Sequence, residues 1–176
     1  PDGRWGIAVN PVANEVFVID AATNAVAHRI PVDGKPFQIG MSSAFAYIRS
    51  LDSERVSMIN LSTLGGSDKP AVNTFSAGAT PPSKVKDLSV AAGIAQAAQE
   101  AAMLVVSPGD DTVYYYMEGM NAPMGAFQNY GHRPRAVEIA NRALKETAPG
   151  VYSTVIRIPA SGTFDVAYLN ENPRFL

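Results

Sequence analysis

The sequence contains no cysteine, and this absence excludes several kinds of chemistry at once. Without thiols the chain forms no disulfide, has no thiolate nucleophile, and cannot hold an iron–sulfur cluster or a blue-copper centre through cysteine. The common catalytic patterns are missing as well: Gly-x-Ser-x-Gly, His-Glu-x-x-His, a glycine-rich phosphate loop and the Cys-x-x-Cys-His haem motif. No carboxylate pair stands out for acid–base work. The sequence favours a protein without catalytic activity but does not decide the question.

Clustered positive charge and long apolar runs are also missing. The 176 residues carry a net charge of −2, and Lys and Arg form no stripe, so a surface for nucleic acid or anionic lipid is not expected. No run of about 18 apolar residues is found, so neither a membrane span nor a signal peptide is expected within the sequence. The sequence starts at Pro1, inside a repeat and without Met, and stops at the apolar Leu176. We therefore expect both termini to be truncated.

Two copies of one pattern organise the first part of the chain. The pattern of segments 5–8 and 16–20 recurs in segments 45–48 and 56–60. When the two copies are aligned, large residues match large residues and apolar residues match apolar residues. The spacing between the two copies is constant and aligns Trp5 with Phe45; we call it the short offset. Short β-branched and aromatic runs between turns, at a period of about 40–45 residues, are typical of four-stranded propeller blades. The predicted strands cover residues 3–10, 15–20, 25–32, 37–41, 42–50, 55–61 and 72–75.

A longer spacing brings the pattern back a third time. At this spacing, apolar residues in segments 47–50 and 56–59 align with apolar residues in segments 104–107 and 113–116. Pro108–Asp111 is the predicted turn between the two strands of this third copy. We call this spacing, which carries Tyr47 onto Leu104, the long offset. Before this third copy, residues from about 65 to 100 interrupt the repeat, and apolar positions near helical spacing predict a short helix or an ordered excursion between Val85 and Ala102. Because surface insertions cost little free energy, an inert insertion is the favoured interpretation.

The repeats resemble a known family. The stretches FVIDAATNAVAHRIPVDGKP and SSAFAYIRSLDSERVSMINL are similar to the YVTN-type β-propeller repeat, in which an Ile-Asp strand end is followed by a Thr-Asn turn, a strand and a Gly-x-x-Pro link. The resemblance covers residues 1–82, and Asn60 stands where the pattern has Asp. It implies a propeller located in the periplasm or outside the cell. The related cytochrome-d1-like propellers imply haem as a cofactor, for which His28, His132 or a Met would be the axial ligand.

A stretch rich in methionine, tyrosine and glycine follows the third copy. Thioether sulfurs suit Cu(I), and a neutral imidazole can complete such a site. The candidate metal ligands are Met117, Met120, Met124 and His132. Methionine also fills irregular cores, and tyrosine gives rigid contact area, so the same stretch fits a packed or docking surface. The candidate interface residues are Tyr114, Tyr115, Tyr116 and Tyr130. We favour packing or docking over metal binding.

The last part of the sequence changes in character. Segments 134–140, 150–159 and 162–169 have the composition of strands. Residues 149–166 resemble a hairpin of small immunoglobulin-like modules, including periplasmic ones associated with copper and cytochrome-oxidase assembly. The sequence thus predicts a partial propeller over residues 1–117 with an insertion at about 65–100, a connecting loop over 118–133, and a β-sandwich module over 134–176.

Taken together, these patterns predict an all-β protein: a partial β-propeller of two to three four-stranded antiparallel blades, followed by a small sandwich-like module. The favoured function is a non-catalytic scaffold or binding protein outside the cytoplasm, accessory to a respiratory or metal-handling complex. The alternative is a redox protein that binds copper or haem through the Met-rich loop or the propeller centre. Propellers close with about 4–8 blades, so the missing blades are expected from further residues or from a protein partner.

Overall fold

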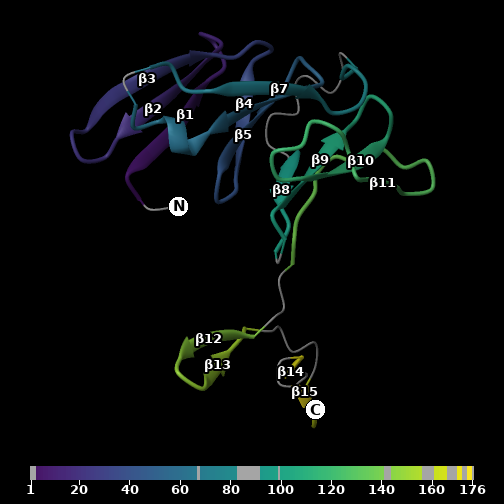
Figure 1. Ribbon diagram of the computed structural model, residues 1–176. Helices are drawn as coiled ribbons and strands as arrows, with labels where there is room; N and C mark the ends of the chain where they lie inside the picture. Colours follow the sequence, from purple (N-terminus) through teal and green to yellow (C-terminus); the bar gives the residue numbers. More distant parts are fainter. Residues whose placement is uncertain are drawn as a thin grey trace. The chain divides into compact units, whose positions relative to one another are not determined.

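The computed structural model describes residues 3–66, 68–82, 92–98, 100–140, 144–155, 161–165, 170–171 and 174–175 (Figure 1). They belong to two compact units, Pro1–Ala140 and Asn141–Leu176. The described residues form strands, turns and irregular segments, with one 3-10 turn, η1 (Leu61–Thr63). No helix in this part of the chain has the length and apolar character needed to cross a membrane.

Three antiparallel sheets make up the first unit, and in each the strands lie side by side in chain order. The first sheet contains β1 (Trp5–Asn10), β2 (Glu15–Asp20) and β3 (Ala25–Pro31). The second sheet contains β4 (Pro36–Met41), β5 (Phe45–Ser50), β6 (Arg55–Asn60) and β7 (Val72–Ser76). The third sheet contains β8 (Ile94–Gln96), β9 (Ala102–Ser107), β10 (Thr112–Met117) and β11 (Gly125–Gln128).

One register recurs in all three sheets. Equivalent opposing pairs are Trp5–Asp20, Phe45–Asn60 and Ala102–Met117. The short offset relates the first pair to the second, the long offset relates the second to the third, and the neighbouring pairs of each ladder keep the same spacing. The predicted repeat of antiparallel blades is therefore confirmed.

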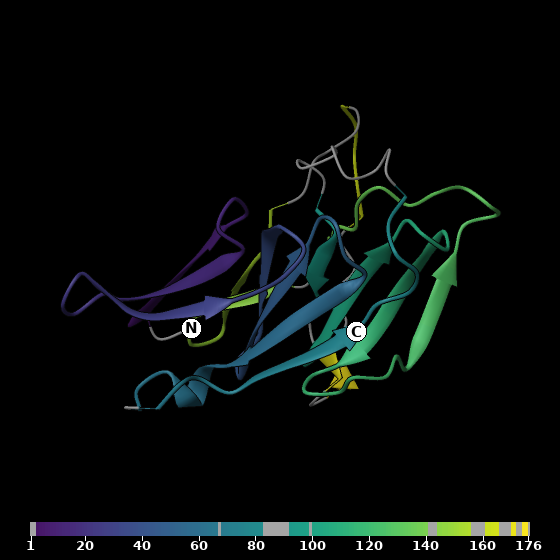
Figure 2. The ribbon, with the colours of Figure 1, turned by 90° about the horizontal axis from the view of Figure 1, so that it is seen from above.

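Apolar side chains fill the space between neighbouring sheets. The first and second sheets enclose Val16, Val18, Ile30, Val32, Ala46, Ile48, Ile59 and Leu64. The second and third sheets enclose Tyr47, Val56, Met58, Phe75, Ala77, Ile94, Met103, Val105 and Tyr116. The second sheet thus packs one face on the preceding sheet and its other face on the following sheet, and Figure 2 shows the three sheets succeeding one another in this way. The predicted equivalent pair Val18 and Met58 is buried in both copies.

Polar contacts join the second and third sheets at both ends of the strands. At one end, the buried guanidinium of Arg49 donates through Nη1 to the Ser53 carbonyl at 2.7 Å and through Nη2 to the Val106 carbonyl at 3.3 Å. At the other end, the Glu118 carboxylate accepts hydrogen bonds from the Ser43 hydroxyl at 3.3 Å and the Ala44 N–H at 3.2 Å. These contacts hold the two sheets in one alignment.

Two sequence-based predictions about the connections need correction. Of the insertion predicted as a short helix or an ordered excursion, residues 83–91 and 99 lie outside the described residues, and Ile94–Gln96 is a strand paired with β9. The predicted connecting loop 118–133 contains β11, which pairs with β10 as the fourth strand of the third sheet. In both places, pairing with the neighbouring strand outweighs the local preference of the sequence.

The described strands of the second unit form short hairpins. β12 (Lys145–Ala148) pairs with β13 (Val151–Ser153), and β14 (Asn170–Glu171) pairs with β15 (Arg174–Phe175). The described side chains of 144–155 and 161–165 are exposed, so they form no sandwich core. Residues 156–160 and 166–169, parts of the predicted strands, lie outside the described residues. Segment 134–140 is not a strand here and belongs to the first unit.

Candidate interaction surface

One face of the third sheet points away from the second sheet. Met103, Val105 and Tyr116 pack towards the second sheet. Because side chains alternate along a strand, the residues between them point the other way. Phe127 of β11 pairs with Val113 and lies on the same face. We call this face, with Leu104, Val113, Tyr115, Met117 and Phe127, the outer face of the third sheet.

The repeat explains why Phe127 is exposed. Phe127 lies opposite Val113 in the ladder, as Ile30 lies opposite Val16 and Phe75 opposite Val56. Ile30 and Phe75 are each 5% exposed because the next sheet covers them, whereas Phe127 is 57% exposed. Among the described residues of the first unit, no sheet covers the equivalent position on the third sheet. The outer face therefore has the composition of a buried interface but has no following sheet in this unit.

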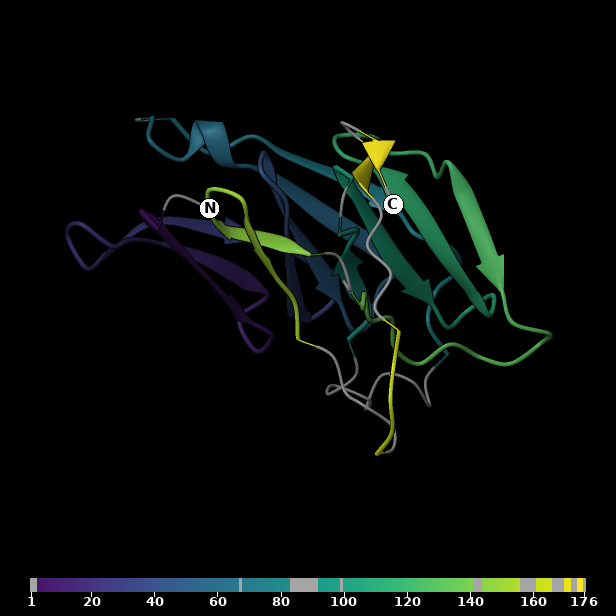
Figure 3. The ribbon, with the colours of Figure 1, turned by 90° about the horizontal axis from the view of Figure 1, so that it is seen from below.

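A second exposed feature is the turn after β11, which lies at the edge of the third sheet in Figures 1 and 3. Tyr130 and Gly131 have φ values of 48° and 76°, and Asn129 forms a bridge with His132. Two successive positive φ angles are those of a type I′ turn. A bulky residue seldom adopts positive φ, and the Tyr130 side chain at this position is 98% exposed.

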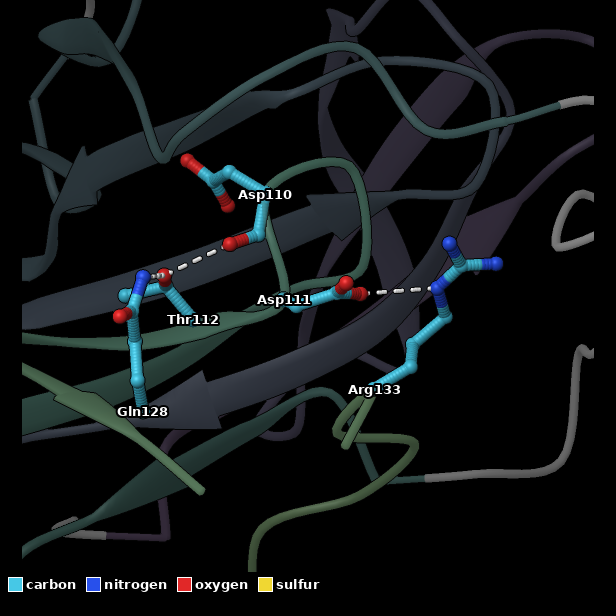
Figure 4. Close-up of polar contacts among 5 residues, drawn as sticks. All are labelled: Asp110, Asp111, Thr112, Gln128 and Arg133. Carbon is cyan, nitrogen blue, oxygen red and sulfur yellow. Dashed lines mark hydrogen bonds and ion pairs between the residues drawn. The ribbon is translucent and has the colours of Figure 1, made fainter. Parts of the chain in front are cut away.

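Side-chain contacts fix the base of this turn to the β9–β10 turn (Figure 4). The Gln128 amide donates to the Thr112 hydroxyl at 3.1 Å, and that hydroxyl donates to the Asp110 carbonyl at 2.9 Å. On the other side, Arg133 Nε forms an ion pair with Asp111 Oδ1 at 2.9 Å. The Tyr130 turn is therefore held on both flanks.

The four candidate interface tyrosines have different environments. Tyr116 is buried between the second and third sheets, its hydroxyl donates to the Ser76 carbonyl at 3.2 Å, and burial raises its pKa to about 12. Tyr114 packs against the same core. Tyr115 lies on the outer face, with its hydroxyl donating to Glu100 and lying 3.4 Å from Met117 Sδ. Only Tyr115 and Tyr130 are thus available for contacts outside the two sheets.

Of the four candidate metal ligands, His132 is separated from the three methionines. Met117 ends β10, and Met120 and Met124 lie in the connection to β11, whereas His132 follows β11. Since β11 is four residues long, a rise of about 3.3 Å per residue puts roughly 13 Å of strand between the connection and the turn that carries His132. In the described part of the chain, no three His, Asp or Glu residues are placed to hold a metal ion. Nε2 of His28, another candidate haem ligand, is 2.9 Å from the Leu64 carbonyl oxygen, a hydrogen-bond distance.

Comparison with known proteins supports the fold alone. Neither a protein-family model nor a curated protein matches the sequence. Among solved structures, Kuenenia stuttgartiensis hydrazine synthase is similar with a TM-score of 0.58, 18% identity and coverage of 77% of this chain and 36% of that chain. BBS1N, solved in complex with ARL6DN, has a TM-score of 0.55 at 7% identity, covering 77% of this chain and 38% of that chain. The Cps50 (Swd1) β-propeller domain of Myceliophteria thermophila has a TM-score of 0.53 at 11% identity, covering 76% and 39%.

This chain therefore spans 36% to 39% of the length of these three structures. The likeness and the repeated register identify the three sheets as blades of a partial β-propeller.

Proposed function

We propose that this chain is part of a non-catalytic β-propeller that works as a protein-binding scaffold and contacts its partner through the Tyr130 turn. The observation that carries the proposal is the 98% exposure of Tyr130 at a positive φ. A strained backbone position that displays an aromatic ring is the kind of outlier from which a functional role can be inferred.

Tyrosine is suited to this role. Its ring buries a large area while only two side-chain torsions become fixed, and its hydroxyl finds a hydrogen-bond partner at the edge of an interface. The Arg133–Asp111 ion pair and the Gln128–Thr112 hydrogen bond fix the turn before a partner arrives. A fixed contact loses less conformational entropy on binding than a mobile one. The expected partner is a folded protein with an apolar pocket for the ring.

Finer features of this proposal come from the sequence resemblance alone. They are a location in the periplasm or outside the cell and a place beside a respiratory or metal-handling complex. The competing function, a copper- or haem-binding redox protein, draws no support from His132, which lies across β11 from the three methionines. Fractionation of the producing cells, followed by immunodetection of the chain, tests the location.

Site-specific photo-crosslinking tests the contact. A benzophenone amino acid is placed at Tyr130 and, as a matched control, at Val12, which is 94% exposed on the β1–β2 turn. Irradiation in the producing cells should give one discrete protein adduct from position 130 and none from position 12. Identical adducts from both positions, or none from position 130, would show that the Tyr130 turn is not the contact.

A further inference from the structure

Three similar links follow the last strands of the three sheets. Each contains a glycine with positive φ a few residues before a proline. The glycines are Gly34, Gly78 and Gly131, with φ of 84°, 81° and 76°, and the prolines are Pro36, Pro81 and Pro134. We call these segments the glycine–proline links. The first link leads into the second sheet, and the second link leads towards the third sheet.

The first link packs on the end of the second sheet over two serines. A Cβ at Gly34 would lie 3.3 Å from Ser50 Cβ and 2.7 Å from Ser53 Cβ. The Ser50 hydroxyl donates to the Asp33 carbonyl at 2.8 Å, and the Ser53 hydroxyl accepts a hydrogen bond from the Arg55 N–H at 3.1 Å. Both hydroxyls therefore have partners within the sheet and its link.

At the equivalent place under the second link, two buried oxygens have no such partner. The long offset relates Ser50 to Ser107, and it relates Ser53 to Asp110. A Cβ at Gly78 would clash with Ser107 Oγ and lie 2.7 Å from Asp110 Oδ2, so the two side chains meet beside this glycine. Ser107 is 0% exposed, and among the described residues neither Ser107 Oγ nor Asp110 Oδ1 has a hydrogen-bond partner. Buried polar atoms in native proteins almost always have one, which indicates a bound ligand here.

The surroundings of Asp110 favour a positive ligand. Its Oδ2 accepts a hydrogen bond from the Tyr114 hydroxyl at 2.6 Å, and in the described part of the chain no ion pair neutralises this carboxylate. Glu54 adds a second negative charge beside the link, where it accepts a hydrogen bond from the Thr80 hydroxyl at 3.0 Å. Arg49, at the same end of the sheets, donates to main-chain carbonyls instead. A cation offsets the buried charge as well as the missing hydrogen bond, whereas water supplies the hydrogen bond alone.

Main-chain oxygens approach the same place. A Cβ at Gly109, the residue before Asp110, would lie 2.5 Å from the Ala79 carbonyl oxygen and 2.9 Å from the Thr80 carbonyl oxygen. Carboxylate, carbonyl and water oxygens are the ligands of hard cations such as calcium, which takes about six to eight of them. Ala79 and Thr80 are exposed, so an ion has access to the link from solvent.

We propose that the second glycine–proline link and the β9–β10 turn bind a calcium ion. Asp110 Oδ1 and Ser107 Oγ are its side-chain ligands, the Ala79 and Thr80 carbonyls are the main-chain oxygens available to it, and water completes its coordination. Because most of these oxygens are neutral, the site does not require three ionisable side chains, which the described residues do not bring together. The ion joins the chain that leaves the second sheet to the turn of the third sheet.

A site with one carboxylate binds calcium weakly, and a Kd of about 10⁻⁴–10⁻³ M is expected. Urea denaturation of the whole chain, in CaCl₂ up to about ten times that Kd and at constant ionic strength, measures the effect. Calcium should then raise the folding equilibrium constant about tenfold, because it binds the folded state. MgCl₂ at the same concentration should do much less, since magnesium demands near-ideal octahedral geometry and loses water reluctantly.

Two neighbouring carboxylates provide a matched pair of variants. Asp110→Asn removes the charge and keeps the shape, so it should fold but bind calcium about tenfold or more weakly. Asp111→Asn removes the same charge one residue further on and should keep the full response to calcium. Figure 4 shows the Asp110 carboxylate pointing away from the ion pair of Asp111 with Arg133. Ser107→Ala removes the unpartnered hydroxyl, so it should weaken the calcium response without lowering the stability measured in the absence of calcium.

Terbium(III) luminescence gives a direct measure of binding. Terbium(III) occupies the oxygen sites of calcium and emits when a nearby tyrosine transfers energy to it, and the Tyr114 hydroxyl lies 2.6 Å from Asp110 Oδ2. The wild type and Asp111→Asn should show emission that added calcium removes. Asp110→Asn should show much weaker emission at the same terbium concentration.

Three results would overturn the proposal. A wild type that calcium stabilises no more than KCl of equal ionic strength would mean that a water molecule satisfies the two oxygens. Equal stabilisation by calcium and magnesium would mean that cations act by screening charge. An equal loss of the calcium response in Asp110→Asn and Asp111→Asn would place the ion on the outside of the turn rather than beside Gly78.

Discussion

The guanidinium of Arg49 on the second sheet donates a hydrogen bond to the main-chain carbonyl of Val106 on the third sheet at 3.3 Å. The same side chain also reaches the Ser53 carbonyl within its own sheet, at 2.7 Å. Burial of this cation lowers the pKa of Arg49 to about 10, and the negative charge of Glu54 partly opposes that shift. One planar side chain thus satisfies carbonyls on two blades.

Replacing Arg49 by Lys should destabilise the chain. A single ammonium group lacks the fixed fork that reaches both carbonyls, and a buried acceptor left without a donor costs about 1–3 kcal/mol. The free energy of unfolding from urea denaturation measures the loss. Arg55→Lys on the exposed start of β6 is the matched control and should change little. Equal effects of the two changes would contradict this role for Arg49.

Equivalent isoleucines on two blades should respond differently to truncation. Ile59 is fully buried between the first and second sheets, whereas Ile19, at the equivalent position, is only partly buried, on the face of the first sheet that points away from the second. Ile59→Ala should cost about 2–5 kcal/mol, and Ile19→Ala clearly less. The free energy of unfolding from urea denaturation measures both losses. An equal loss at the two positions would contradict the difference in burial.

The short and long offsets of the sequence predict the strands and their pairing well because a side-chain period of two and a fixed turn length determine the register. The pair Phe45–Asn60 and its equivalents follow directly from them. The sequence predicts β11 poorly, since its Gly125 and Ala126 have low strand preference and become a strand by pairing with β10. The same reason explains why β8 is not predicted: its alanine-rich window predicts a short helix or an ordered excursion, and the strand forms by pairing with β9.

The candidate site was predictable only in part. The exposure of Tyr130 follows from the Asn-Tyr-Gly-His turn sequence, but the burial of Tyr116 depends on which face of β10 meets the second sheet. Sequence reasoning missed Phe127 and assigned segment 134–140 to the sandwich module, whereas the segment belongs to the first unit. The sequence did contain a signal for the place of this segment: it follows the link from Gly131 to Pro134, which resembles the links at Gly34 and Gly78 that precede the second and third sheets.

Acid should weaken the contact between the second and third sheets through Glu118. A hydrogen bond from the Ser42 hydroxyl, with others from Ala44 N–H and Ser43, lowers the pKa of Glu118 below its ordinary 4.5. The unfolded chain therefore takes up a proton first as the pH falls. The stability from Glu118 is present above pH 4.5 and is lost as the pH drops through the folded-state pKa.

Urea titrations of the wild type and Glu118→Gln between pH 7 and 3 measure this dependence. The wild type should be more stable at neutral pH, and its advantage should shrink below pH 4.5. A difference that stays constant over the whole range would exclude a role for this carboxylate.

Two glycines in equivalent links should differ in their tolerance of a side chain. A Cβ at Gly78 would clash with the Ser107 hydroxyl and lie 2.7 Å from Asp110 Oδ2, whereas one at Gly131 has nothing within 4 Å. Both have positive φ, which costs about 1–2 kcal/mol for a residue with a Cβ. Thermal and urea unfolding should therefore show Gly78→Ala to be the more destabilising change. A larger loss for Gly131→Ala would contradict the packing around Gly78.

Methionine replacements should leave docking intact. Met-to-Leu changes conserve volume and usually cost less than about 1.5 kcal/mol, and Met124 is 62% exposed. The triple change of Met117, Met120 and Met124 to Leu should therefore keep the photo-crosslink at position 130. Dialysis of the wild type with Cu(I) should leave no retained copper. Copper that is retained by the wild type and by His132→Ala, but lost from the triple variant, would instead identify a thioether site.

The repeated glycine–proline links also bear on how such a chain can change in length over evolution. The links from Gly34 to Pro36 and from Gly78 to Pro81 each join the last strand of one sheet to the first strand of the next, so a gene segment cut at these two links encodes one whole sheet. Such a sheet has one face that fits its predecessor and one that fits its successor, as the second sheet shows. Duplication or deletion between links would therefore add or remove complete blades while leaving every hydrogen-bonded ladder unbroken.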